Sequence, residues 1–204
     1  MPANSATAGL TKDADLEHAP FLDGRQIYLR PLERSDINAT YLAWINDPGI
    51  TRYLEVGTFP STMEDLEKFY ESVAGTRTNV LMTIMHKDSK QHIGNLKLGP
   101  IDWVHRRAVF GILIGETRFW GCGIGQEATR LIVEYAFERL NLHRVILGVV
   151  AEHEPAVRCY EKVGFKIEGR AREDLFKDGE YKDRLWMGLL RSEYKREATN
   201  AGSK

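Results

Sequence analysis

The hydrophobic pattern predicts a chain in which strands and helices alternate. Strand-like runs or alternations of apolar residues occur at 25–30, 80–85, 92–98, 108–114, 144–150, 165–169 and 182–190. Apolar residues recur at helical spacing in 35–47, 61–70, 124–140 and 155–163. Short polar connections join the strands between 80 and 114, which predicts an antiparallel meander. The segment 108–150 instead reads strand, helix, strand and adds one parallel pair. The expected fold class is therefore α/β (α+β), with a mixed, mostly antiparallel central sheet and flanking helices.

The two ends of the chain lack this pattern. Residues 1–24 are small, polar and unpatterned, and residues 197–204 are polar, so both are expected to be flexible tails. The intervening stretch, 25–196, shows no internal repeat and no break that would mark a second domain. A chain of 204 residues is long enough for one good core. We therefore expect a single domain over 25–196.

A glycine-rich turn lies between the strand 108–114 and the helix that follows it. Gly121, Gly123 and Gly125 occupy alternate positions in this turn. Glycine lets the backbone bend sharply and approach a ligand without a clash at Cβ. The amides of the turn and of the first helical turn have no partner within the helix, and partial positive charge gathers there. The sequence therefore predicts a pyrophosphate site at this turn.

Two other interpretations of the turn are weaker. A dinucleotide-binding fingerprint requires G-x-G-x-x-G, and its last position here is Gln126. That fold also begins near its glycine turn, whereas half of this chain precedes it. A tight turn without a ligand would leave the three glycines unexplained, because each weakens the helix start by about 0.5–1 kcal/mol relative to alanine.

Composition narrows the class of protein. The net charge of −1 gives no electrostatic case for nucleic acid, and no apolar run is long enough to cross a membrane. No secretion signal is readable, and two cysteines, Cys122 and Cys159, do not suggest a disulfide framework. The six histidines show no metal-ligand spacing, so no metal is expected. These features predict a cytoplasmic protein.

Two motifs, taken together, resemble the GNAT superfamily of N-acetyltransferases. The glycine turn is similar to the acyl-CoA-binding motif, and 160–165, Y-E-K-V-G-F, is similar to the family's Y-E-K-x-G-F helix and strand. Two sequence motifs, W-G-C-G-I-G at 120–125 and D-R-L-W-M at 183–187, are most similar to the RimJ/RimL-like branch. Trp120 stands where the family often has Arg or Gln, with Arg118 nearby, and His153 stands where it favours Asn.

The resemblance implies a GNAT fold with acetyl-CoA as co-substrate. The strand ending in 112–114 would splay from 144–150, pantetheine would pair with the exposed backbone, and an N–H near Leu113 or Ile114 would stabilise the oxyanion. Amides of the glycine turn would bind the pyrophosphate. The expected cofactor-binding residues are Ile112, Leu113, Ile114, Arg118, Trp120, Gly121, Cys122, Gly123, Ile124, Gly125, Gln126, His153, Ala156 and Lys162.

Acetyl transfer to an amine requires a neutral nucleophile, an oxyanion donor and a proton for the leaving thiolate. Tyr160 is the expected general acid, since thiols have a pKa of about 8.5 and phenols of about 10. Glu116, just beyond the acetyl-binding strand, is the candidate base. Cys122 lacks a readable His-Asp partner set, which favours direct attack in a ternary complex over an acyl-enzyme. Further candidates for the base are Asp102, His105, Glu152, His153 and Glu154.

The acceptor is the least constrained part of the prediction. Trp44, Tyr53 and Trp103 are aromatic residues in segments expected to border the acceptor pocket. The absence of a long acidic run disfavours a polyamine and favours a small primary amine, such as an amino sugar. A protein N-terminal amine of the ribosomal-protein type is the alternative acceptor. A non-catalytic acyl-CoA-binding sensor is the alternative of another class. A homodimer would fit the branch.

Overall fold

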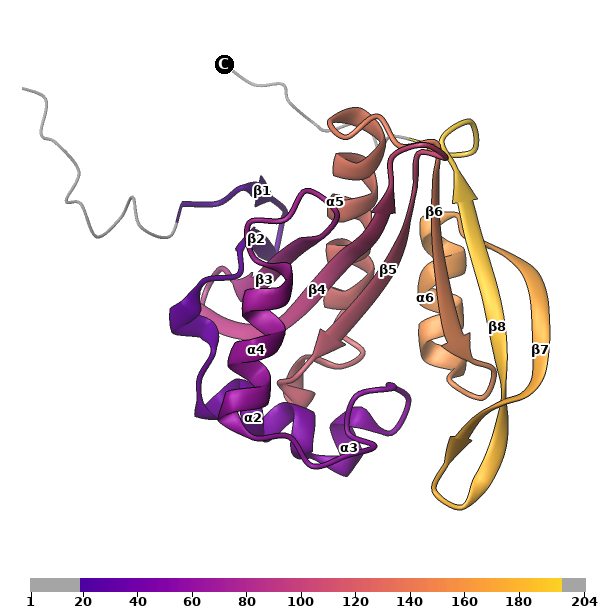
Figure 1. The fold of residues 1–204 in the computed structure, drawn as a ribbon. Helices are drawn as coiled ribbons and strands as arrows, with labels where there is room; N and C mark the ends of the chain where they lie inside the picture. The colour runs from indigo at the N-terminus through magenta and orange to yellow at the C-terminus, as the bar shows by residue number, and fades with distance from the viewer. Residues whose placement is uncertain (1–18, 196–204) are drawn as a thin grey trace, which may run out of the picture.

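The structure is a computed structural model that describes residues 19–195, and the rest of the two expected tails lies outside the described residues. One eight-stranded sheet runs through the domain in the order β1-β2-β3-β4-β5-β6-β8-β7 (Figure 1). Its strands are β1 (Leu22–Asp23), β2 (Ile27–Pro31), β3 (Val80–His86), β4 (Gln91–Asp102), β5 (Arg107–Ile114), β6 (Arg144–Val150), β7 (Lys166–Lys177) and β8 (Glu180–Leu190).

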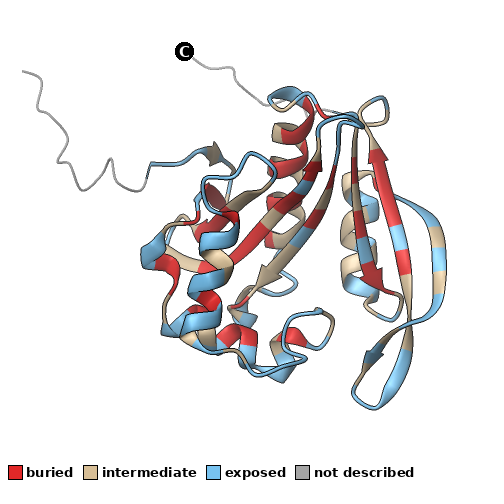
Figure 2. Cartoon of the chain, viewed as in Figure 1, coloured by how far each residue is buried: buried red, intermediate tan, exposed pale blue. Residues whose placement is uncertain are grey.

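Helices cover both faces of the sheet (Figure 1). On one face lie α2 (Ala39–Asn46), α3 (Pro48–Thr51) and α4 (Met63–Val73), and on the other lie α5 (Ile124–Glu138) and α6 (Glu154–Val163). Short 3₁₀ turns occur at η1 (Arg34–Asp36) and η2 (Thr117–Phe119). The larger core packs the sheet against α5, and a smaller core packs α2 and α4 against the opposite face. Figure 2 shows the buried positions concentrated on the central strands and on the inner side of α5.

The only parallel pairing among the described strands joins β5 and β6, and it is short. Arg107, Ala108 and Val109 pair with Arg144, Val145 and Ile146. Beyond these positions β5 continues to Ile114 and β6 continues to Val150, but the two strands no longer pair. The predicted splay is therefore present, and it leaves one edge of each strand without a neighbouring strand.

Several element boundaries differ from the sequence-based expectation. The expected tail 1–24 extends too far, because Leu22 and Asp23 pair with β2 as strand β1. The first helix begins at residue 39 rather than 35, because Asn38 supplies the cap, its Oδ1 accepting from the amides of Thr40 and Tyr41. The second helix begins at residue 63 rather than 61, because Thr62 supplies the cap of α4.

The side chain of Glu127 joins the start of the sheet to the start of α5. Its Oε1 accepts hydrogen bonds from the backbone amides of Arg25, Gln26 and Ile27. Its Oε2 lies 3.3 Å from Nε2 of Gln26. Glu127 lies in the first turn of α5, directly after the glycine turn. One carboxylate thus fixes β2 against the helix that opens the predicted pyrophosphate site.

Candidate active site

The three glycines of the turn have two different roles. Gly121 has φ +75° and Gly123, the residue preceding α5, has φ +84°, a region that favours glycine. Gly125 lies inside α5 without a positive φ, and a Cβ built there would meet only Sγ of Cys159, at 4.0 Å. Gly121 and Gly123 therefore shape the turn, whereas Gly125 leaves open space beside the first amides of the helix.

The side chains around these glycines hold the turn in place. The indole Nε1 of Trp120 donates to the carbonyl oxygen of Ile114 at 2.9 Å, which ties the turn to the end of β5. The guanidinium of Arg118 donates to Gln91 and lies 3.7 Å from the carboxylate of Glu116. The thiol of Cys122 faces the carbonyl oxygens of Arg118 and Trp120. These contacts tie the turn to β4, to the end of β5 and to the preceding 3₁₀ turn.

The start of α5 fits a diphosphate. N–H groups of a first helical turn have no partner within the helix and carry partial positive charge. The acidic residue of this turn, Glu127, already accepts from backbone amides of residues 25–27, so its charge is partly compensated. Open space at Gly125 allows close approach of the phosphate oxygens. The expected contacts through residues 121–126 remain predictions that this geometry supports.

A cavity of about 760 Å³ lies where β5 and β6 separate. Its floor includes Phe110, Gly111, Ile112 and Leu113 of β5 together with Gly148 and Val150 of β6. The walls come from α2, α4, the segment 53–56 and the β7–β8 hairpin. Most of the lining is apolar, as is typical of small-molecule sites. We refer to this space as the acceptor cavity.

Tyr160 of α6 lies beside the point where the strands separate. Its ring meets the ring of Phe110 edge-on, with centroids 6.2 Å apart, and the ring of Phe165 at 6.0 Å. Burial raises the pKa of the Tyr160 hydroxyl above its ordinary value, and the neighbouring Cys159 adds to the shift. The phenol is therefore protonated at neutral pH, as a proton donor must be. The raised pKa makes it a weaker acid than an exposed phenol.

A contact between the rings of His153 and Tyr53 joins the start of α6 to the segment that follows α3. Their rings stack with centroids 4.1 Å apart and planes within 13°. Tyr53 lines the acceptor cavity, and His153 immediately precedes α6. Burial and the nearby Arg52 lower the pKa of His153, which favours the neutral imidazole. Its Nδ1 is buried without a hydrogen-bond partner among the described residues.

Two of the three aromatic residues expected to contact the acceptor lie elsewhere. Trp44 is 4% exposed and packs in the smaller core, where its indole occupies the space a side chain at Gly115 would need. Trp103 lies in the β4–β5 connection, and its Nε1 donates to the carbonyl oxygen of Arg77 at 3.0 Å. Neither residue lines the acceptor cavity. The cavity therefore gives these two assignments no support, because helical or loop spacing alone does not separate core aromatics from cavity aromatics.

The base candidates are not brought to the cavity. Glu116 follows β5, and its carboxylate faces Arg118 rather than the cavity lining. Asp102 accepts from the amide of His105 in the β4–β5 connection, far along β5 from Ile114. The assignment of Glu116 as base stays a prediction. Attack by an amine that reaches the site already neutral needs no protein base.

The remaining cofactor-binding predictions lie on α6. Ala156 packs against the larger core, and its amide donates to the carbonyl oxygen of His153 at 3.0 Å. Lys162 lies in the last turn of the helix, where its carbonyl oxygen accepts from Arg130. Within residues 19–195, no group of three or more His, Cys, Asp and Glu side chains is placed to hold a metal ion. No helix in this part of the chain is long and apolar enough to span a bilayer.

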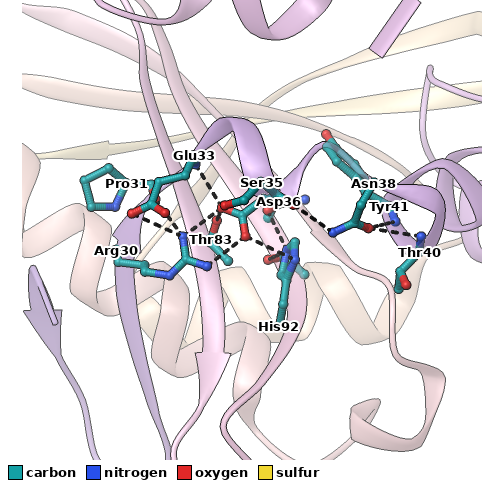
Figure 3. A network of polar contacts seen from close by, with 12 residues as sticks. Arg30, Pro31, Glu33, Ser35, Asp36, Asn38, Thr40, Tyr41, Thr83 and His92 are labelled. Atoms are coloured by element: carbon teal, nitrogen blue, oxygen red, sulfur yellow. Dashed lines mark hydrogen bonds and ion pairs between the residues drawn. The ribbon is translucent and has the colours of Figure 1, made fainter. Parts of the chain in front are cut away.

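The structure also shows a buried polar chain that the sequence analysis missed (Figure 3). Arg30 and Asp36 form two hydrogen bonds of 2.7 Å, and Thr83 Oγ1 donates to the same carboxylate. His92 Nδ1 lies 3.9 Å from Asp36, and its Nε2 lies 2.9 Å from Oδ1 of Asn95, which lines the acceptor cavity. In the sequence, Asn95 alternates with apolar residues and resembles the solvent face of any strand.

Comparison with known proteins identifies the family. The profile of the acetyltransferase (GNAT) domain matches residues 26–166. The spermidine N(1)-acetyltransferase of Escherichia coli K12 is 30% identical over 176 residues, covering 86% of this chain and 92% of the relative. That of Vibrio cholerae is 32% identical over 170 residues, covering 83% and 95%.

A solved structure gives the same result for the fold. The crystal structure of the Vibrio cholerae spermidine N-acetyltransferase in complex with CoA and spermine superposes with a TM-score of 0.76 at 31% identity, covering 83% of this chain and 98% of that one. The RimJ/RimL-like branch stays a prediction. The chain belongs to the GNAT acetyltransferase family and is an acetyl-CoA-dependent N-acetyltransferase.

Proposed function

We propose that the protein acetylates a small primary amine that carries oxygen or anionic groups, such as an amino sugar, by direct attack in a ternary complex. The observation that supports this most is the acceptor cavity itself. It lies at the splay of β5 and β6, next to the expected acetyl-binding residues Ile112 and Leu113, and its volume of about 760 Å³ suits a small molecule.

The charges around the acceptor cavity bear on the acceptor. Two carboxylates line it, and both are engaged. Glu55 pairs with Arg184 at 2.7 Å, and Asp65 binds the backbone and hydroxyl of Thr62 at the start of α4. Lys97 and Lys177 also line the cavity. With Arg184, they set three cationic side chains against the two carboxylates, so the lining has one positive charge in excess, which favours an acceptor with an anionic or neutral body.

A polyamine is the second candidate, and the relatives favour it. The enzymes of Escherichia coli and Vibrio cholerae described above are spermidine N-acetyltransferases that cover most of this chain. A polyamine at neutral pH carries several ammonium groups and needs free carboxylates. Lys97 and Lys177 would repel these groups, since unit charges about 4 Å apart interact by about 4 kcal/mol near a protein surface.

A protein acceptor and a non-catalytic role have less support. A protein N-terminal amine would need a surface for the following residues. The two relatives described above are spermidine N-acetyltransferases. A non-catalytic sensor would not explain why Tyr160 lies at the splay.

A thiol-release assay with acetyl-CoA tests the proposal. The acceptor panel is glucosamine, glucosamine 6-phosphate, spermidine and a short peptide with a free N-terminal amine. We expect the aminosugars to give the higher kcat/KM, and the phosphorylated one to have the lower KM. Turnover with spermidine alone would replace the proposed acceptor by the polyamine. Turnover with the peptide alone would replace it by the protein amine.

A further inference from the structure

The side chain of Asn95 presents an unused hydrogen-bond donor to the acceptor cavity. Asn95 is 7% exposed, and it lines the cavity from β4. Its Nδ2 has no hydrogen-bond partner among the described residues. A buried polar atom without a partner is costly, and native structures contain few of them. The donor therefore requires a reason.

The orientation of the Asn95 amide is fixed from behind. Nε2 of His92 lies 3.1 Å from the carbonyl oxygen of Gly94 and 2.9 Å from the Asn95 side chain. A backbone carbonyl only accepts, so Nε2 of His92 must carry the proton. The atom of Asn95 that faces His92 must then be the oxygen, and the NH₂ group must point the other way.

His92 is itself held by the buried ion pair. Its Nδ1 lies 3.9 Å from Asp36, which forms two hydrogen bonds with Arg30 (Figure 3). The ring of Trp44 meets the His92 ring edge-on with centroids 5.0 Å apart. Packing on one side and polar contacts on the other leave the imidazole little freedom to turn. The amide of Asn95 is therefore preorganised rather than adaptable.

The Tyr41 hydroxyl is the nearest competitor for the Asn95 donor. Burial raises the pKa of Tyr41 to about 12, and hydrogen bonding by the Asn95 side chain opposes part of that rise, so the two groups are close. Their contact falls short of an ordinary hydrogen bond, so Nδ2 has no partner at that distance. Both residues line the acceptor cavity, so a bound molecule can reach them together.

Asn95 also lies next to the expected site of chemistry. It is directly opposite Leu113 in the β4–β5 ladder. Side chains directly opposite each other in an antiparallel pair have Cβ atoms about 4.5–5.5 Å apart. An amine that attacks a thioester held at Leu113 therefore has its neighbouring atoms within reach of the amide.

We infer that Asn95 donates a hydrogen bond to an oxygen of the acceptor beside the attacking amine, and so selects vicinal amino alcohols and related oxygen-bearing amines. The inference rests on the proposed function, because it needs acetyl transfer to an amine in the acceptor cavity. An ammonium group or a methylene cannot accept from Nδ2, so a polyamine leaves the donor unpaired. Asn95 is a specificity residue that touches the acceptor.

The test compares two acceptors that differ by one hydroxyl, trans-2-aminocyclohexanol and cyclohexylamine, in the thiol-release assay. The wild-type protein should prefer the amino alcohol by at least about tenfold in kcat/KM, because a hydrogen-bonding site rejects analogues that lack the group. In Asn95→Leu the preference should fall to about twofold or less, with the affinity for CoA unchanged.

Stability separates a specificity role from a structural one. Asn95→Leu leaves the carbonyl of Gly94 as a partner for His92, and it removes the orphaned donor. Its melting temperature should therefore not be lower than that of the wild type. Thr83→Val is the matched control, since it removes a buried hydrogen bond to Asp36 outside the cavity. That variant should melt lower and keep the preference.

Each outcome decides one question. Equal rates with the two cyclic amines in the wild type, including no turnover of either, would overturn the inference. So would a preference that survives Asn95→Leu. Release of thiol with spermidine alone would overturn the inference and leave acetyl transfer intact. Absence of thiol release with every amine would instead contradict the proposed function.

Discussion

Gly125→Ala should make the free protein more stable and should lower its affinity for CoA. The position is inside α5, its φ is not positive, and a Cβ would meet only Sγ of Cys159 at an ordinary 4.0 Å. Alanine in place of a helical glycine gains about 0.5–1 kcal/mol. For a chain of this size, 1 kcal/mol raises the melting temperature by about 2–4 °C.

The same methyl group would occupy space expected for the phosphate oxygens. Loss of one hydrogen bond to a charged group costs about 1.5–3 kcal/mol, which corresponds to roughly tenfold to a hundredfold in the dissociation constant. Gly123→Ala should behave differently. A side chain at φ +84° costs about 1–2 kcal/mol, so that variant should lose both stability and affinity.

Thermal unfolding and calorimetry with CoA measure the two quantities. Gly169→Ala is the control, because a Cβ there meets nothing within 4 Å and the residue lies in β7, away from the turn. It should bind CoA as the wild type does. A Gly125→Ala protein that binds CoA with wild-type affinity would refute the argument that this glycine admits the diphosphate.

Three further substitutions or conditions probe the rest of the site. Tyr160→Phe should lower turnover by at least about tenfold with little change in CoA affinity, and a wild-type rate would remove Tyr160 from the mechanism. Burial lowers the pKa of both His92 and His153, so the unfolded chain binds more protons below about pH 6.5 and the free energy of unfolding should fall with the pH there. Urea unfolding at pH 7.5 and 5.5 checks this, and His153→Asn should show a smaller difference; an equal one would contradict the role of His153. Lys97→Glu should raise kcat/KM for spermidine and lower it for glucosamine 6-phosphate by about tenfold each. Unchanged values of kcat/KM would show that Lys97 does not select the acceptor by its charge.

Local sequence signals predicted most of the fold and the glycine turn. Gly121 and Gly123 need a backbone that glycine favours, and the helix after them has clear periodicity, so the turn was readable from the chain alone. The family fold, with its splay, followed from the resemblance. Tyr160 was located by the motif around it, and the structure adds its contact with Phe110.

The acceptor side could not be predicted in the same way. Trp44 and Tyr53 belong to one continuous segment, yet one packs in the core and the other lines the cavity. The difference depends on which of the two side chains packs against the sheet. Asp36 lies in the segment 35–47, which was expected to be helical, but its carboxylate accepts hydrogen bonds from Arg30 and Thr83 of neighbouring strands. The proposed role of Asn95 could be inferred only when the hydrogen-bond partners of its side-chain amide were known.

The hydrogen bonds of Glu127 link two regions that lie about a hundred residues apart in the sequence. Three consecutive amides, the last of them at the start of β2, partly compensate the charge of an acid that lies beside the expected pyrophosphate site. If this segment detached, the carboxylate would lose these donors and would repel a phosphate at the start of α5. The start of β2 is therefore expected to contribute to coenzyme binding, although none of its atoms needs to touch the coenzyme.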